Sequence, residues 1–107
     1  MRTAVVVCLA TLAALFSACQ RSSDPVETGR LAYQANCTAC HNPDPAREGT
    51  VGPALAGSSP ELVRARVLRA EYPPGYTPQR ETHLMPAQPF LAPQVDALAA
   101  YLGSLRR

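Results

Sequence analysis

The distribution of prolines is the feature that most limits what this chain can fold into. Six prolines fall between Pro73 and Pro93. Proline lacks a backbone N–H and clashes with the preceding turn of a helix, so this stretch cannot form a long helix or a central strand. A loop of such length in a small domain normally has a function or is disordered. We therefore expect regular structure to lie on either side of a long loop.

Start signals around this loop predict helices, and no pattern predicts a convincing strand. Residues 24–27 read Asp-Pro-Val-Glu, a capping-box pattern with proline at the first helical position, which predicts a helix over 25–35. The Ser-Pro-Glu of 59–61 predicts a second helix to about residue 70. A last helix is expected to open at Pro93, because apolar residues then recur on one face: Val95, Leu98, Leu102 and Leu105. The expected fold class is all-α, with three to four helices.

The N-terminal segment is not expected to belong to this fold. An apolar run over 4–16 follows Arg2, and it is too short for a transmembrane helix but typical of an export signal. The Phe-Ser-Ala before Cys19 resembles the lipobox of bacterial lipoproteins, in which the cysteine receives diacylglycerol. We expect a lipoprotein-type signal peptide over 1–18, lipidation of Cys19 and a polar tether over 19–24. A plain secretory cut that leaves a free thiol is the alternative.

The remaining domain, residues 25–107, is short enough to need stabilisation beyond its hydrophobic core. Small exported domains usually obtain it from disulfides, a metal or a cofactor. Once Cys8 leaves with the signal, the cysteines are Cys19, Cys37 and Cys40. Two close cysteines and an isolated one cannot cross-link the domain, so we expect a metal or a cofactor.

Residues 37–41 read Cys-Thr-Ala-Cys-His, the CxxCH pattern of c-type haem attachment. Two thiols three residues apart reach the two vinyl groups of the porphyrin, and the next side chain reaches the iron. The motif predicts one covalent haem c, attached to Cys37 and Cys40, with His41 as an iron ligand. A zinc site of Cys37, Cys40 and His83 would lack an easy fourth ligand. A thioredoxin-like CxxC expects a βαβ setting, and a Cys37–Cys40 disulfide would be strained.

With this motif the chain resembles the monohaem class I cytochrome c family over nearly the whole mature domain. Three further segments carry the resemblance: the GPALAG of 52–57, which is similar to the family's GPxLxG, the Met85-Pro86 pair, and the Ala-Tyr-Leu of 100–102 in the last helix. The resemblance implies a small cytochrome c fold whose first and last helices cross beside the haem. Residues at that crossing would be Gly29, Tyr33 and Tyr101.

The resemblance also bears on the groups around the iron. It implies that the carbonyl of Pro53 accepts the Nδ1 proton of His41, which orients the ligand. For the sixth iron position the loop offers His83 and Met85, and we favour Met85 because a Met-Pro pair matches the family and Met/His ligation raises the haem potential. His83 and an open site remain the alternatives.

Several other residues are weaker candidates for the haem environment. Tyr72, Tyr76 and Arg80 suit hydrogen bonds to the haem propionates, but surface positions in the proline loop are equally compatible with the sequence. A set of apolar residues is expected to pack on the porphyrin or between helices: Leu55, Leu68, Phe90, Val95, Leu98 and Leu102.

The expected function is one-electron transfer, without chemistry on a small-molecule substrate, because two filled axial positions leave no place for dioxygen or peroxide. Without Arg2, nine arginines face eight acids, a balance of +1 that does not indicate nucleic-acid binding. The arginines concentrate only at Arg64, Arg66 and Arg69, where a solvated helix face is expected. Expected partners are redox proteins and, through the lipid anchor, the periplasmic side of a bacterial membrane. A haem-based sensor and the haem subunit of an exported dehydrogenase or oxidase are the alternatives.

Overall fold

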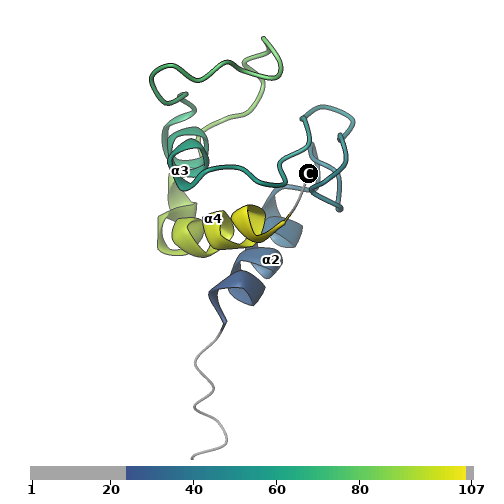
Figure 1. Cartoon of the computed structure of the whole chain (residues 1–107), viewed down its shortest axis with the longest axis vertical. Coiled ribbons are helices and arrows are strands. Elements are labelled where there is room, and N and C mark those ends of the chain that lie inside the picture. The colour runs from purple at the N-terminus through teal and green to yellow at the C-terminus, as the bar shows by residue number, and fades with distance from the viewer. Residues whose placement is uncertain (1–23, 106–107) are drawn as a thin grey trace, which may run out of the picture.

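The computed structural model describes residues 24–105, and the regular elements in that range are all helical (Figure 1). The three α-helices are α2 (Pro25–Asn36), α3 (Pro60–Arg69) and α4 (Val95–Ser104). A 3-10 helix, η1 (Pro89–Gln94), leads directly into α4. The all-α fold class is therefore confirmed, and the first two helices end within a residue of the predicted positions. The prediction for Pro93 is wrong, because it lies inside η1 instead of opening α4.

Some predictions concern residues outside the described range. These are the signal peptide over 1–18, the lipidation site Cys19 and most of the tether over 19–24. Within residues 24–105, no helix is long and apolar enough to cross a lipid bilayer.

The first two α-helices begin at side-chain caps that the sequence predicted. The Asp24 carboxylate accepts a hydrogen bond from the N–H of Val26 at 3.0 Å, and the Ser59 hydroxyl caps α3 in the same way. The other half of the predicted capping box is not formed. Instead of folding back on the helix start, the Glu27 carboxylate pairs with the guanidinium of Arg30 one turn further on. A charged donor makes a stronger hydrogen bond than a backbone amide, which explains the difference.

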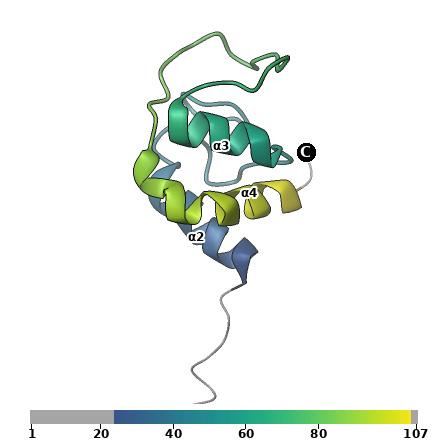
Figure 2. The same cartoon turned by 90° about the vertical axis from the view of Figure 1, so that its left-hand side faces the viewer.

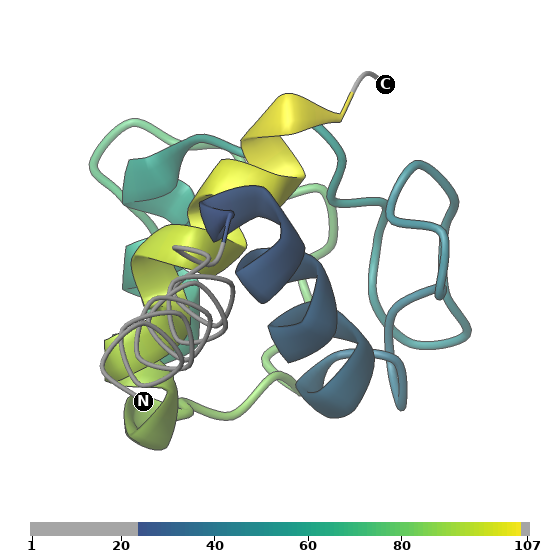
Figure 3. The same cartoon turned by 90° about the horizontal axis from the view of Figure 1, so that it is seen from below.

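Helices α2 and α4 cross in close contact (Figure 3). A Cβ atom at Gly29 would lie 2.0 Å from the carbonyl oxygen of Ala97 and 2.7 Å from the Cβ of Tyr101. Beside this point the rings of Tyr33 and Tyr101 meet with centroids 5.8 Å apart and planes tilted by 59°. The helix crossing implied by the resemblance, with a glycine and two aromatic residues, is thus confirmed.

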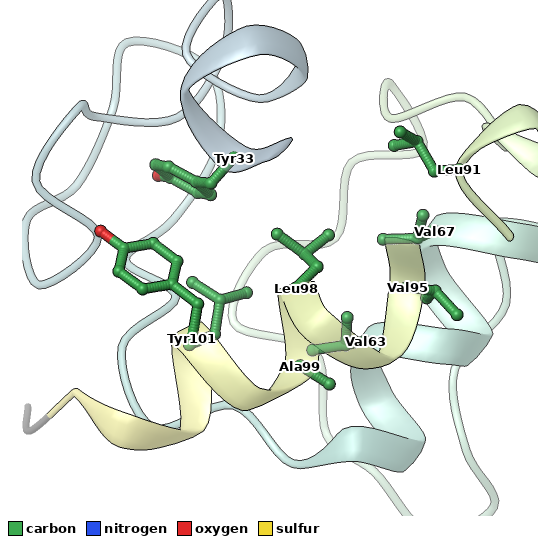
Figure 4. Close-up of a cluster of buried hydrophobic side chains, with 9 residues drawn as sticks. Tyr33, Val63, Val67, Leu91, Val95, Leu98, Ala99 and Tyr101 are labelled. Carbon is green, nitrogen blue, oxygen red and sulfur yellow. The ribbon is translucent and has the colours of Figure 1, made fainter. Parts of the chain in front are cut away.

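The core lies where α3, η1 and α4 pack together and against Tyr33 of α2 (Figure 4). Tyr33 is fully buried, and its hydroxyl donates to the carbonyl of Asn42 at 2.6 Å. Of the apolar residues expected to pack on the porphyrin or between helices, Phe90 is a wrong prediction, because it is 68% exposed and does not line the cavity beside the CTACH turn. Its neighbour Leu91 points into the core instead, at 3% exposure. The other five are buried or half-buried: Leu55, Leu68, Val95, Leu98 and Leu102.

The proline-rich stretch forms a long loop between α3 and η1, as predicted, although its last residues, from Pro89 on, belong to η1. Figure 2 shows this loop extending beyond α3, on the side away from α4. A turn at Gly75, with φ of 77°, and a hydrogen bond from Tyr76 to the carbonyl of Pro73 shape its first part. The loop rejoins the helices at Gln88, whose N–H donates to the carbonyl of Val67 at 2.6 Å.

Candidate functional site

The CTACH segment forms a tight turn at the end of α2. The N–H of Cys37 closes the helix by donating to the carbonyl of Tyr33 at 2.9 Å. The carbonyl of Cys37 in turn accepts from Cys40 at 3.3 Å and from His41 at 2.9 Å. These bonds gather the two cysteines and the histidine on one turn, as the spacing requires.

Backbone hydrogen bonds hold segment 49–53 against this turn. The carbonyl of Cys40 accepts hydrogen bonds from the N–H groups of Val51, at 3.2 Å, and Gly52, at 2.9 Å. Gly49 lies so close that a Cβ there would be 2.3 Å from the same carbonyl oxygen. The start of the GPALAG segment is therefore held directly against the CTACH turn.

His41 is buried and oriented by this contact. Its Nδ1 lies 2.9 Å from the carbonyl oxygen of Pro53. Because a carbonyl only accepts hydrogen bonds, Nδ1 carries a proton, and in the neutral ring Nε2 then keeps its lone pair for a metal. Gly52 packs on the ring, since a Cβ there would meet three ring atoms at 2.3 to 2.8 Å.

Burial favours the neutral form of the His41 imidazole. Loss of solvent lowers its pKa, the hydrogen bond to Pro53 opposes that shift, and the nearby charge of Arg80 lowers the pKa further. The thiol of Cys37 is half-buried, and burial raises its pKa to about 11. Cys40, in contrast, is exposed.

A cavity of about 260 Å³ opens beside the turn. Cys37, Cys40 and His41 line it, and so does Met85 from the proline loop. His83 is exposed and does not contribute to its wall. The helices supply a largely apolar wall: Leu62, Val63, Val67, Leu98 and Leu102.

Polar groups of the cavity come from α3 and from the proline loop. The guanidinium of Arg66 lies 4.3 Å from the ring centre of Tyr72, which in turn stacks on Tyr76 at 5.5 Å. All three line the cavity, as does Arg80. Arg66 thus faces the cavity, whereas the sequence predicted a solvated arginine face. Among residues 24–105, no three His, Cys, Asp or Glu side chains gather into a metal site, so the zinc alternative finds no ligand set there.

Arg80 and its neighbour Gln79 make contacts that the sequence does not predict. Arg80 donates to the carbonyl of Val51 at 2.9 Å and to the carboxylate of Glu48 at 3.2 Å. The amide of Gln79 donates to the carbonyl of Ala54 at 3.3 Å. These pairs are 25 to 32 residues apart in the chain, and no local pattern indicates them.

A family model described as cytochrome c oxidase, cbb3-type, subunit III matches residues 24–102 of the chain. The chain belongs to this family of monohaem c-type cytochromes. No curated protein and no solved structure gives a significant match. A cytochrome c domain of this family binds a covalent haem c with its iron and supports haem-based electron transfer.

The residues around the cavity fit such a group. The cytochrome presents two neighbouring thiols and a neutral imidazole with an available Nε2 lone pair at one apolar cavity. Gly52 leaves room for that imidazole, which any Cβ at this position would displace. The donor set is therefore that of covalent attachment plus nitrogen ligation of iron.

Proposed function

We propose that the chain is an electron carrier in which Cys37 and Cys40 hold the haem through thioether bonds and His41 and Met85 ligate the iron. The carrying observation is that these four side chains line one cavity, which His83 does not reach. The resemblance to class I cytochromes c, with its Met-Pro pair at Met85, supports the same ligand set.

In this proposal the haem supplies a one-electron change at its iron, and the protein sets the conditions for it. The Pro53 carbonyl fixes the ring orientation of His41 and increases the electron density at Nε2. The apolar wall from α3 and α4 limits contact with water. The hydroxyls of Tyr72 and Tyr76 offer hydrogen bonds to the haem carboxylates, and the guanidinium of Arg66 beside them offers a positive charge.

The sixth ligand is tested by replacing each candidate in holoprotein matured in a host that attaches haem. Methionine ligation gives ferric haem c a weak charge-transfer band at long wavelength, which we expect in the wild type. Met85→Ala should abolish the band, while His83→Ala, the matched control two residues away, should retain it. A band that survives Met85→Ala would refute the assignment of Met85.

We also propose that residues 1–18 are an export signal, that Cys19 is lipidated and that 19–24 tethers the domain, residues 25–107, to the periplasmic side of a bacterial membrane. The support is the apolar run and the lipobox-like residues before Cys19. Mass spectrometry of Cys19→Ser should show loss of the acyl chains, together with release from membranes. Cys8→Ser is the control, because a cysteine within the cleaved signal should leave the mature mass unchanged. A wild-type mature chain without acyl mass would refute the anchor.

A second candidate is a haem subunit of an exported oxidase. The description of the matching family, a subunit of a cytochrome c oxidase, favours this possibility. Purification from the native membrane in mild detergent distinguishes an oxidase subunit from a free electron carrier. A subunit should co-migrate with other oxidase chains in fixed proportion, whereas a free carrier should migrate alone.

A further inference from the structure

The loop segment 77–87, which contains Met85, makes few hydrogen bonds to the rest of the molecule. Within the part of the chain that the structure describes, its hydrogen bonds to other segments come from two side chains, Gln79 and Arg80. Backbone hydrogen bonds to the helices resume only at Gln88. The position of Met85 therefore depends on side-chain contacts, since prolines at 78 and 86 remove two backbone donors.

Arg80 makes the stronger of these attachments. One end of its guanidinium donates to the carbonyl of Val51 at 2.9 Å, and the other donates to the carboxylate of Glu48 at 3.2 Å. The side chain is only 31% exposed, while that of Glu48 is 73% exposed. An exposed ion pair contributes little by itself, so the bond to the Val51 carbonyl is the principal contact.

This contact connects the loop to the part of the chain that positions His41. The same residue that accepts from Arg80, Val51, donates its N–H to the carbonyl of Cys40 in the CTACH turn. The next residue, Gly52, packs on the His41 ring. The guanidinium of Arg80 thus links the segment that contains Met85 to the segment that supports the ring of His41.

We propose that Arg80 is a positioning residue, which holds the loop of Met85 against segment 48–52 and so keeps the methionine at the cavity. This inference rests on the proposed ligation by Met85. Without the fork of hydrogen bonds, the loop opens more often and leaves the iron position of Met85 accessible to added ligands. Arginine is suited to this task because its planar guanidinium reaches two acceptors at once, which the single ammonium of lysine does less well.

The test uses the holoprotein and imidazole as an added ligand of the ferric iron. In Arg80→Gln we expect affinity for imidazole to rise about tenfold and the methionine charge-transfer band to weaken. Arg69→Gln is the matched control, because Arg69 pairs with Glu71 on the surface and does not line the cavity. Its imidazole affinity should stay within about twofold of the wild type. Equal affinities in the two variants would overturn the inference.

Two further measurements separate this inference from the function on which it rests. Glu48→Gln removes only the ion pair and leaves the hydrogen bond to Val51, so it should raise imidazole affinity less than Arg80→Gln does. If the Arg80→Gln protein fails to mature, Glu48→Gln takes its place in the comparison with Arg69→Gln. Cleavage after Glu81 by a glutamate-specific protease should be faster in Arg80→Gln than in Arg69→Gln, whatever ligates the iron. Equal cleavage rates would overturn the role of Arg80, whereas a wild type without the methionine band would refute only the ligation by Met85.

Discussion

The substitution Gly29→Ala tests the helix crossing most directly. The new Cβ would lie 2.0 Å from the carbonyl oxygen of Ala97 and 2.6 Å from its carbonyl carbon. Close carbon–oxygen contacts in proteins are about 3.3 Å or longer, so α2 and α4 must separate by about 1 Å. The atoms that the Cβ meets belong to a helix backbone, which cannot move aside by changing a rotamer.

The expected cost follows from two opposing effects. Overpacking of a tight contact costs about 1–3 kcal/mol, and a backbone clash belongs at the upper end of that range. Alanine regains about 1 kcal/mol through its higher helix propensity. The net loss in the free energy of unfolding is therefore about 2 kcal/mol, which lowers the Tm of a domain of this size by about 8–16 °C.

Thermal unfolding of the holoprotein, followed by far-ultraviolet circular dichroism, measures this loss. Gly103→Ala is the matched control, because Gly103 lies in α4 and the nearest atom to its Cβ would be the Ser58 carbonyl oxygen at 3.8 Å. That variant should be as stable as the wild type or slightly more stable. A Gly29→Ala protein that unfolds at the wild-type temperature would show that the helices do not cross at this glycine.

Three other substitutions test the core, a helix cap and the ligand pocket. Tyr33→Phe leaves the carbonyl of Asn42 without its donor and should cost about 1–2 kcal/mol in urea unfolding at pH 8. Burial also raises the pKa of the Tyr33 hydroxyl, so wild-type stability should fall above about pH 10 and fall less in this variant. Ser59→Ala removes the cap of α3 and should cost about 1 kcal/mol in the same assay. Gly52→Ala should displace the His41 ring and give the ferric visible spectrum a high-spin component that the wild type lacks.

The helices were predictable because their signals are local. Caps at Asp24 and Ser59 and the one-face spacing of α4 each involve residues within a few positions of one another. The errors occurred where neighbouring residues compete for one role. At η1, a 3-10 helix puts Leu91 into the core, so the adjacent Phe90 faces solvent. Hydrophobicity alone does not distinguish those two residues.

The candidate site was predictable in its motif but not in its surroundings. The CTACH spacing fixes which side chains share a turn, and the family resemblance supplied the Pro53 carbonyl and the crossing at Gly29. The partners of Arg66 and Arg80 depend on the path of the loop after α3. Because that path is set by packing between distant segments, these arginines could not be distinguished from solvated surface residues by sequence.

The prolines explain why the contacts of this loop could not be predicted from the sequence. A residue without an N–H cannot be fastened by a backbone hydrogen bond, so the more proline a loop contains, the more its position depends on side chains. Here that dependence falls on Gln79 and Arg80, whose acceptors are backbone carbonyls and one carboxylate of other segments. Any residue type has a backbone carbonyl, so the sequence does not mark these acceptors. Changes at Gly29 and Arg80 should consequently have separable effects, the first on the unfolding of the helices and the second on access to the iron at constant helix stability.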